Sequence, residues 1–226
     1  MKRISLYLFF LVSIGELVAH VVDVSLLHLV CKPLIMLSLF GFYWFASTER
    51  ENQRSRSLML GILFSFFGDV ALMGEGELYF MLGLVSFLLA HVAYIFTYRQ
   101  HRYDSDDGLS GVQRFRFSFP FLLAGTGLVT VLYPHLGDLK VPVMIYALVI
   151  VLMVINALFR YGHTTAKSFW LVFVGAILFM ISDSLLAFNK FVVPIDEAGF
   201  WIMITYIAAQ YGIVQGIILH TDVSQG

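Results

Sequence analysis

The sequence has little charge and almost no cysteine, and both shortages narrow the choice of protein class. Only 13% of the 226 residues are charged, against about 25% in a soluble domain. The formal net charge is −1, so no basic field indicates nucleic acid as a partner. The single cysteine, Cys31, excludes an internal disulfide and a zinc site built from cysteines. The chain is instead 59% hydrophobic, with a mean hydropathy of +0.85, which is typical of an integral membrane protein.

Signature motifs of several enzyme classes are also missing. The seven histidines form no H-x-x-x-H or H-E-x-x-H pair, which argues against a zinc hydrolase. The chain contains no G-x-S-x-G elbow and no glycine-rich phosphate loop, which argues against a serine hydrolase and a nucleotide-binding site. The sequence therefore predicts no metal site.

Long apolar runs are abundant instead. A helix needs about 20 mostly apolar residues to cross a bilayer. Eight such runs occur, at 4–22, 25–46, 57–74, 78–98, 116–133, 141–159, 168–188 and 199–219. Because the runs are unbroken, we expect helices and not the alternating strands of an outer-membrane barrel. The first run lacks a clean cleavage site, which favours a membrane helix over a signal peptide. The predicted fold is one all-α transmembrane domain over residues 1–226.

Lysine and arginine predict the orientation of these helices. Of the 14 basic residues, 11 lie at the N-terminus or in the second, fourth and sixth connections, and at most Lys32, Lys140 and Lys190 lie on the other side. The positive-inside rule therefore places both termini in the cytoplasm. The host membrane would be the cytoplasmic membrane of a bacterium, or the endoplasmic reticulum or another endomembrane of a eukaryote. The longest connection, at 99–115, is polar and predicts a mobile loop.

Three acidic residues fall inside predicted spans, namely Glu16, Asp69 and Asp183. A carboxylate near the middle of a membrane helix costs about 2.5–3.5 kcal/mol, so such a residue marks a functional site by default. The alternative is a buried polar group that holds helices together.

Asp69 and Asp183 share a sequence pattern. Each follows a glycine by eight positions and a small residue by one, and each precedes a leucine by three. The two copies lie 114 residues apart, in the third and seventh spans, which predicts two parallel four-helix repeats at 1–114 and 115–226. Nearby small residues would let these helices pack closely; they are Gly61, Ser65, Gly68, Gly175 and Ser182. We expect the two carboxylates to face one central cavity.

Polar side chains in the fourth and eighth spans are candidates for lining the same cavity. His91, Tyr94 and Tyr98 share one helical face, and so do Tyr206 and Gln210. Interhelical hydrogen bonding or an aromatic belt is the alternative for both sets. On a straight helix His91 would lie about 10 Å from the depth of Asp69, so it would line the lower cavity.

Two further polar groups lie in the first two spans. Lys32, before Pro33, could neutralise a carboxylate or hold a phosphate, or its side chain could extend to the membrane surface. Glu16, His20 and Asp23 share one face of the first span. They look like a metal cluster, but water can reach that depth, and a solvated entrance rim is the favoured interpretation.

Short motifs along the chain are similar to those of one membrane family. They are Lys32-Pro33-Leu34, Phe67-Gly68-Asp69-Val70-Ala71-Leu72-Met73, Ala90-His91-Val92-Ala93-Tyr94, Ser182-Asp183-Ser184-Leu185-Leu186-Ala187, Asn189-Lys190-Phe191 and Ala209-Gln210. These motifs occur in the same order as in the YhhN-like lysoplasmalogenase family. With its eight spans, the chain resembles that family over nearly its whole length.

The resemblance implies hydrolysis of the vinyl ether bond of a lysoplasmalogen. The products would be a fatty aldehyde and glycerophosphoethanolamine or glycerophosphocholine, formed without a metal or organic cofactor. Asp69 and Asp183 match the family's two catalytic aspartates. The predicted substrate-binding residues are Lys32, His91, Tyr94, Tyr206, Gln210, Asn189 and Lys190.

The chemistry of a vinyl ether suits two carboxyl groups. Protonation of the β-carbon gives an oxocarbenium ion, which takes up water and collapses to an aldehyde and an alcohol. One carboxyl group must donate a proton while another faces the cation, as in glycosidases. Two desolvated carboxylates close together resist ionising together and would divide these roles. The sequence does not indicate which aspartate has which role.

Two other functions use intramembrane aspartates. A proton- or ion-coupled transporter is the first alternative, because parallel repeats and midplane carboxylates are typical of that class. The second is an intramembrane aspartyl protease, although Phe66-Phe67-Gly68-Asp69 lacks the first glycine of that motif. The expected partners are a lysophospholipid substrate and membrane lipid.

Overall fold

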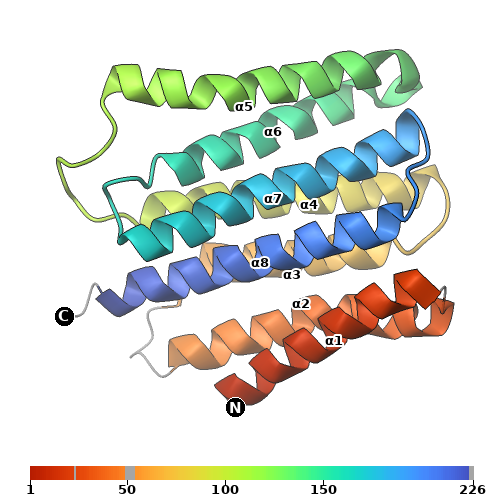
Figure 1. The fold of residues 1–226 in the computed structure, drawn as a ribbon, viewed down its shortest axis with the longest axis horizontal. Helices are drawn as coiled ribbons and strands as arrows, with labels where there is room; N and C mark the ends of the chain where they lie inside the picture. Colours follow the sequence, from red (N-terminus) through yellow and green to blue (C-terminus); the bar gives the residue numbers. More distant parts are fainter. Residues whose placement is uncertain (23, 49–53, 224–226) are drawn as a thin grey trace. The chain divides into compact units, whose positions relative to one another are not determined.

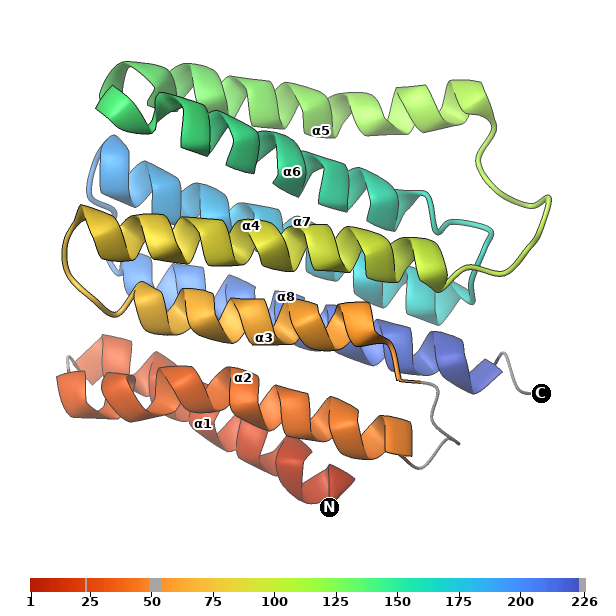
Figure 2. The same ribbon diagram turned by 180° about the vertical axis from the view of Figure 1, so that it is seen from behind.

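The computed structural model describes residues 1–22, 24–48 and 54–223. Asp23, which the sequence places on the predicted rim of the first span, lies outside these ranges. Eight α-helices and two short 3₁₀ turns make up the described chain (Figures 1 and 2). The elements are α1 (Lys2–Val22), α2 (Ser25–Thr48), α3 (Arg56–Ala71), α4 (Glu77–Gln100), α5 (Gly111–Leu132), η1 (Tyr133–His135), η2 (Gly137–Leu139), α6 (Lys140–Leu158), α7 (Ala166–Phe191) and α8 (Ala198–Val223).

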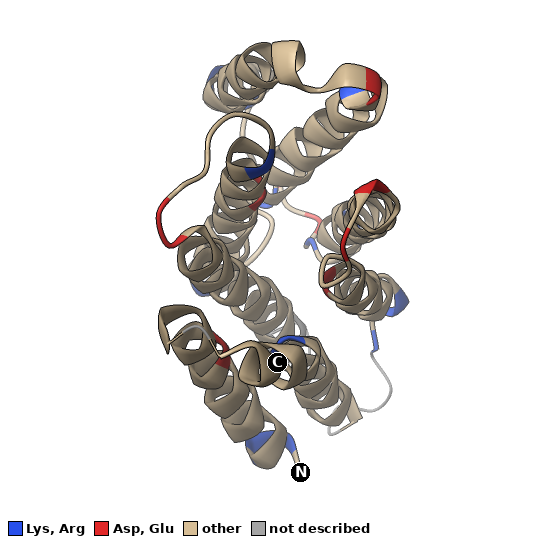
Figure 3. Cartoon of the chain, turned by 90° about the vertical axis from the view of Figure 1, so that its right-hand side faces the viewer, with Lys and Arg blue, Asp and Glu red and all other residues tan. Residues whose placement is uncertain are grey.

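The predicted all-α fold is confirmed, and each predicted span has its helix. Among the described residues, seven helices are long and apolar enough to cross a membrane. The remaining helix, α3, has only 16 residues and ends three residues before the predicted boundary at 74. At 1.5 Å per residue it is about 24 Å long. Basic and acidic residues concentrate at helix ends and in connections, as the end-on view shows (Figure 3).

The chain divides into two compact units, Met1–Thr97 and Tyr98–Gly226. In the first unit, successive helices run in opposite directions, so the turns after α1 and α3 lie at one end (Figure 2). In the second unit, α5 to α8 alternate in the same way. Parallel repeats and cytoplasmic termini stay predictions.

Small residues let neighbouring helices approach closely, as predicted. A Cβ atom on Gly175 of α7 would lie only 2.9 Å from the carbonyl oxygen of Ala209, and one on Gly212 of α8 would lie 2.9 Å from that of Leu171. The backbones of α7 and α8 are therefore in contact, which is how small residues at four-residue spacing associate helices in membranes. The Ser168 hydroxyl adds a 2.7 Å hydrogen bond to the carbonyl oxygen of Gly216.

The connection between α4 and α5 is tethered, contrary to the mobile loop that its polar sequence predicts. The backbone N–H of Tyr103 donates to the carbonyl oxygen of His163 at 2.7 Å, and its hydroxyl donates to that of His220 at 3.2 Å. Gly162 has φ +76°, and a Cβ there would lie 2.1 Å from the carbonyl oxygen of Asp107. Only glycine fits such a close approach in this conformation.

Arg160 is the buried anchor of this tethered segment. Its Nε donates to the carbonyl oxygen of His101 at 3.2 Å, and its Nη2 donates to the hydroxyl of Ser168 at 3.0 Å. Burial is the largest cause that lowers the pKa of Arg160, to about 10, with a further contribution from the charge of Arg102. The side chain is therefore still a cation at neutral pH, and its hydrogen bonds are charge-assisted.

Replacing Arg160 with methionine should loosen the segment 101–110 without unfolding the protein. Loss of charge-assisted bonds worth about 1.5 kcal/mol would raise the open population, and with it trypsin cleavage after Arg102, by roughly tenfold. Cleavage of the detergent-purified protein can be followed by mass spectrometry. Arg116→Met, at an exposed position in α5, is the matched control, and equal cleavage of both variants would contradict the anchoring role.

Candidate functional site

Asp69 lies near the end of α3, at a close contact with α4. Its side chain is only 3% exposed. A Cβ on the preceding Gly68 would lie 2.6 Å from the ring of Phe87, and one on Gly83 would lie 2.6 Å from the side chain of Leu72. From Gly68 to Leu72 the chain moves forward along α3, while the contacting residue in α4 moves back from Phe87 to Gly83. They therefore define an antiparallel register that fixes the height of Asp69 beside α4.

The predicted polar face of α4 is buried. His91, Tyr94 and Tyr98 are all 0% exposed, as one inward face requires. Tyr94 packs against α3 because its ring occupies the space beside Gly61, where a Cβ would lie 2.5 Å from it. The Tyr94 hydroxyl also lies 3.5 Å from that of Ser65.

Asp183 lies in α7 and is half-buried. Its Oδ2 accepts a short hydrogen bond from the hydroxyl of Tyr146 in α6. The sequence interpretation did not include Tyr146 in the site. A signal was available, because Tyr146 and Asn156 are the two polar side chains of the run 141–159.

The candidates in α8 are buried beside α7. Tyr206 is 3% exposed and Gln210 is fully buried. The ring of Tyr206 makes an edge-to-face contact with that of Phe179, with centroids 5.4 Å apart. One turn further along α7, the hydroxyl of Ser182 donates to the carbonyl oxygen of Ile202 at 3.0 Å. These contacts hold α8 against the helix that carries Asp183.

Asn189 and Lys190 lie at the end of α7, away from the buried face. The side-chain oxygen of Asn189 accepts a 2.8 Å hydrogen bond from the backbone N–H of Ile195, so this residue fastens the connection to α8. Lys190 is exposed. The binding roles predicted for both residues stay predictions.

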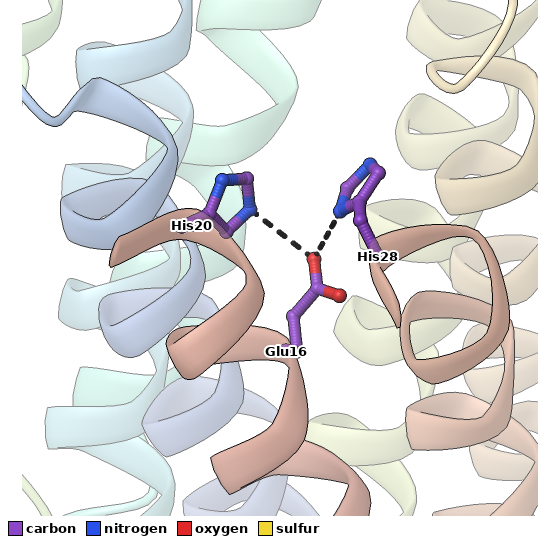
Figure 4. Close-up of side chains that lie close together, drawn as sticks. All are labelled: Glu16, His20 and His28. Atoms are coloured by element: carbon purple, nitrogen blue, oxygen red, sulfur yellow. Dashed lines mark hydrogen bonds and ion pairs between the residues drawn. The ribbon is translucent and has the colours of Figure 1, made fainter. Parts of the chain in front are cut away.

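The predicted solvated rim on α1 is wrong for Glu16, which is 0% exposed. Its Oε1 lies 2.7 Å from Nδ1 of His28 in α2 and 3.2 Å from Nε2 of His20 in α1 (Figure 4). The spacing on α1 had identified two of these residues, but His28 comes from the other side of the α1–α2 turn. Lys32 is half-buried, and its charge acts on Glu16, which agrees with the predicted neutralisation of a carboxylate.

The two aspartates belong to different units, and the structure describes each unit by itself. Asp69 belongs to the α3–α4 hairpin of the first unit, and Asp183 to the α6–α7–α8 region of the second. Their meeting in one cavity stays a prediction.

The sequence profile of the YhhN family matches residues 27–217. This match covers most of the chain, including both aspartates. The chain belongs to the YhhN family. The resemblance inferred from the motifs is thereby confirmed.

Other proteins similar to this YhhN-family chain carry the name lysoplasmalogenase. Human lysoplasmalogenase TMEM86B is 30% identical over 179 residues, which cover 79% of this chain and 70% of the human protein. Bovine lysoplasmalogenase TMEM86A is 27% identical over 190 residues, covering 80% and 72% of the two chains. The lysoplasmalogenase of Mycobacterium bovis is 28% identical over 203 residues, covering 87% and 74%. No solved structure matches the chain.

The contact between Gly68 and Phe87 should make this YhhN-family chain sensitive to one added methyl group. Gly68→Ala would overpack the α3–α4 contact and lower the free energy of unfolding by about 1–3 kcal/mol. Gly127→Ala in α5 is the control: a Cβ there has nothing within 4 Å, and alanine should gain about 0.5–1 kcal/mol.

Unfolding by SDS in a mild detergent would measure both changes. Adding Phe87→Leu to Gly68→Ala should recover part of the loss, because the smaller side chain frees the space for the methyl group. If Gly68→Ala were as stable as Gly127→Ala, the close contact beside Asp69 would be refuted.

Proposed function

We propose that this protein is a membrane lysoplasmalogenase that hydrolyses the vinyl ether bond of a lysoplasmalogen. The observation that carries the proposal is its YhhN family membership, together with similarity to lysoplasmalogenases over about four fifths of its length. Seven described helices suited to a membrane agree with a lipid substrate. The products would be a fatty aldehyde and glycerophosphoethanolamine or glycerophosphocholine.

The packing of two helix pairs supports an internal repeat that relates the two aspartates. In α3–α4, Gly61 lies opposite Tyr94 and Gly68 opposite Phe87. The residues 114 positions later in α7 are Gly175 and Ser182, which lie opposite Ala209 and Ile202 in α8. Both partners in α8 come 115 positions after those in α4. The two hairpins thus have nearly the same register.

This register gives Asp69 and Asp183 equivalent heights in their hairpins. It also makes Tyr206 the counterpart of His91, since these residues are 115 positions apart. Both side chains are buried. We infer from this repeat that both carboxylates face one central cavity, which His91 and Tyr206 would line.

The reaction needs a proton donor and an anion on opposite sides of the vinyl ether. Transfer of a proton from one carboxyl group to the β-carbon leaves an oxocarbenium ion, which the other carboxylate stabilises. The carboxylate then takes a proton from water as the water's oxygen bonds to the cationic carbon. Collapse of the hemiacetal breaks the carbon–oxygen bond: the second carboxyl group gives its proton to the glycerol oxygen, and the hemiacetal hydroxyl proton returns to the first carboxylate. The sum is one water consumed, one aldehyde and one alcohol formed.

The surroundings of the two aspartates favour different roles. Tyr146 donates a hydrogen bond to Asp183, and an ionised carboxylate is a pure acceptor. We assign Asp183 as the carboxylate that faces the cation and activates water. Asp69 is almost completely buried, as the proton donor of a carboxyl pair commonly is. The pair titrates as one coupled system.

The remaining candidates would bind the substrate. His91, Tyr94, Tyr206 and Gln210 are buried side chains of α4 and α8 and would line the cavity around the glycerol and the vinyl ether. Lys32 is half-buried in α2 and suits the phosphate group. Asn189 and Lys190, at the end of α7, would meet the head group at the membrane surface.

Replacing either aspartate with asparagine should abolish most of the activity. Asn keeps the size of the side chain but can neither donate an acidic proton nor carry the negative charge. We expect aldehyde release from lysoplasmalogen to fall at least roughly a hundredfold in Asp69→Asn and Asp183→Asn. Asp138→Asn, exposed in η2, should keep the wild-type rate.

The same three variants separate the alternatives. Full activity of both intramembrane variants in folded protein would refute the catalytic pair. A wild-type protein that releases no aldehyde from either head group, but conducts ions in liposomes through Asp69 and Asp183, would favour the transporter. Cleavage of a membrane peptide would favour the protease.

Tyr146 should act as a positioning residue for Asp183. Tyr146→Phe removes one hydrogen bond to a charged group, which is worth about 1.5 kcal/mol, so kcat should fall roughly tenfold. KM should change little, because the phenol is assigned no contact with the substrate. Tyr133→Phe, on an exposed ring at the end of α5, is the control. Unchanged kcat in Tyr146→Phe would remove Tyr146 from the mechanism.

A further inference from the structure

The α1–α2 hairpin brings one carboxylate and two imidazoles together, outside the site described above. Ligand atoms of Glu16, His20 and His28 all lie within 4.8 Å of one another. Glu16 and His20 are one turn apart on α1, and His28 follows the turn into α2. Figure 4 shows both imidazoles directed at the same carboxylate oxygen. The turn is closed by backbone hydrogen bonds from Val24 to Ala19 and from His28 to Val24, so the cluster is part of the fold.

Two polar atoms of this cluster are buried and form no hydrogen bond with the described residues. One is Oε2 of Glu16, on a side chain that is 0% exposed. The other is Nε2 of His20, which is paired with Oε1 of Glu16 at 3.2 Å in an ion pair that Figure 4 draws. A buried polar atom without a partner costs about 1–3 kcal/mol. One cation bound between the side chains would satisfy both atoms.

The donor set matches zinc. Two histidine nitrogens and a glutamate oxygen are a known zinc ligand set that leaves a fourth position for water. Zinc bonds of about 2.0–2.2 Å in a tetrahedron place ligand atoms about 3.3–3.5 Å apart. Oε1 of Glu16 is 2.7 Å and 3.2 Å from the two imidazole nitrogens, so small side-chain rotations would produce this spacing.

We propose that Glu16, His20 and His28 bind a zinc ion at the α1–α2 turn. The histidine side chains are 24% and 29% exposed, so an ion can enter from the surface while the carboxylate stays covered. The charge of Lys32 acts on Glu16 and weakens the attraction of the carboxylate for a cation. Zinc would hold the ends of α1 and α2 together.

The test measures metal binding by the full-length protein in detergent. After treatment with a chelator and its removal, the wild type should bind one Zn²⁺ per chain, as measured by titration calorimetry and elemental analysis. Co²⁺ in its place should give the intense visible absorption of a four-coordinate site. Zinc should also raise the unfolding temperature, since it binds the folded chain preferentially.

Substitutions of the three proposed ligands, with one control substitution, test where the zinc ion binds. Glu16→Gln, His20→Gln and His28→Gln should each bind zinc at least roughly tenfold more weakly and lose the thermal shift. His135→Gln, at an exposed histidine in η1, should behave as the wild type. Circular dichroism checks that each variant is folded.

The proposal is overturned if the wild type binds no zinc, or if all three variants bind it as the wild type does. The Co²⁺ spectrum of the wild type tests the site even if a variant does not fold. Aldehyde release depends on Asp69 and Asp183, so failure of the zinc site and failure of the hydrolase proposal are separate results.

Discussion

The structure depends on one constraint: a polar side chain between apolar helices must find its partner inside the protein. Lipid offers no hydrogen bonds to replace water. The contacts of Asp183 with Tyr146, of Glu16 with His28 and of Ser168 with the Gly216 carbonyl each join two helices. In so apolar a chain these few bonds, together with close packing at glycines, specify which helix faces overlap. The polar residues that determine the packing are therefore the same residues from which a reactive site can be built.

The helices were predictable because each has a local cause. An apolar run of about 20 residues is sufficient to identify a membrane helix, and the predicted spans coincide with α1 to α8 within a few residues. The partners of the acidic groups were not predictable. Tyr146 and His28 come from neighbouring helices, and helical spacing relates only residues of the same helix. The tethered segment 101–110 was missed for the same reason, because its partners lie in the α6–α7 connection and α8.

The two hairpins that carry the aspartates pack differently despite their shared pattern. In α7–α8 the glycines bring backbone against backbone, whereas in α3–α4 the rings of Tyr94 and Phe87 lie over Gly61 and Gly68. A ring can rotate or shift more readily than a backbone in contact. The α3–α4 pair is therefore the more adaptable of the two. The carboxyl groups also differ in burial: Asp183 is half-buried beside the phenol of Tyr146, whereas Asp69 is only 3% exposed.

The shortness of α3 has a consequence for the surrounding lipid. Its 16 residues span about 24 Å, several ångströms less than the hydrocarbon core of about 30 Å. A bilayer accommodates such a mismatch by thinning locally or by letting flanking residues reach the surface. Asp69 lies two residues before the end of this helix, so the locally thinned part of the bilayer would lie beside it. Head groups and their water would then come close to a carboxyl group that the sequence places inside a membrane span, which is where a lipid must meet water to be hydrolysed.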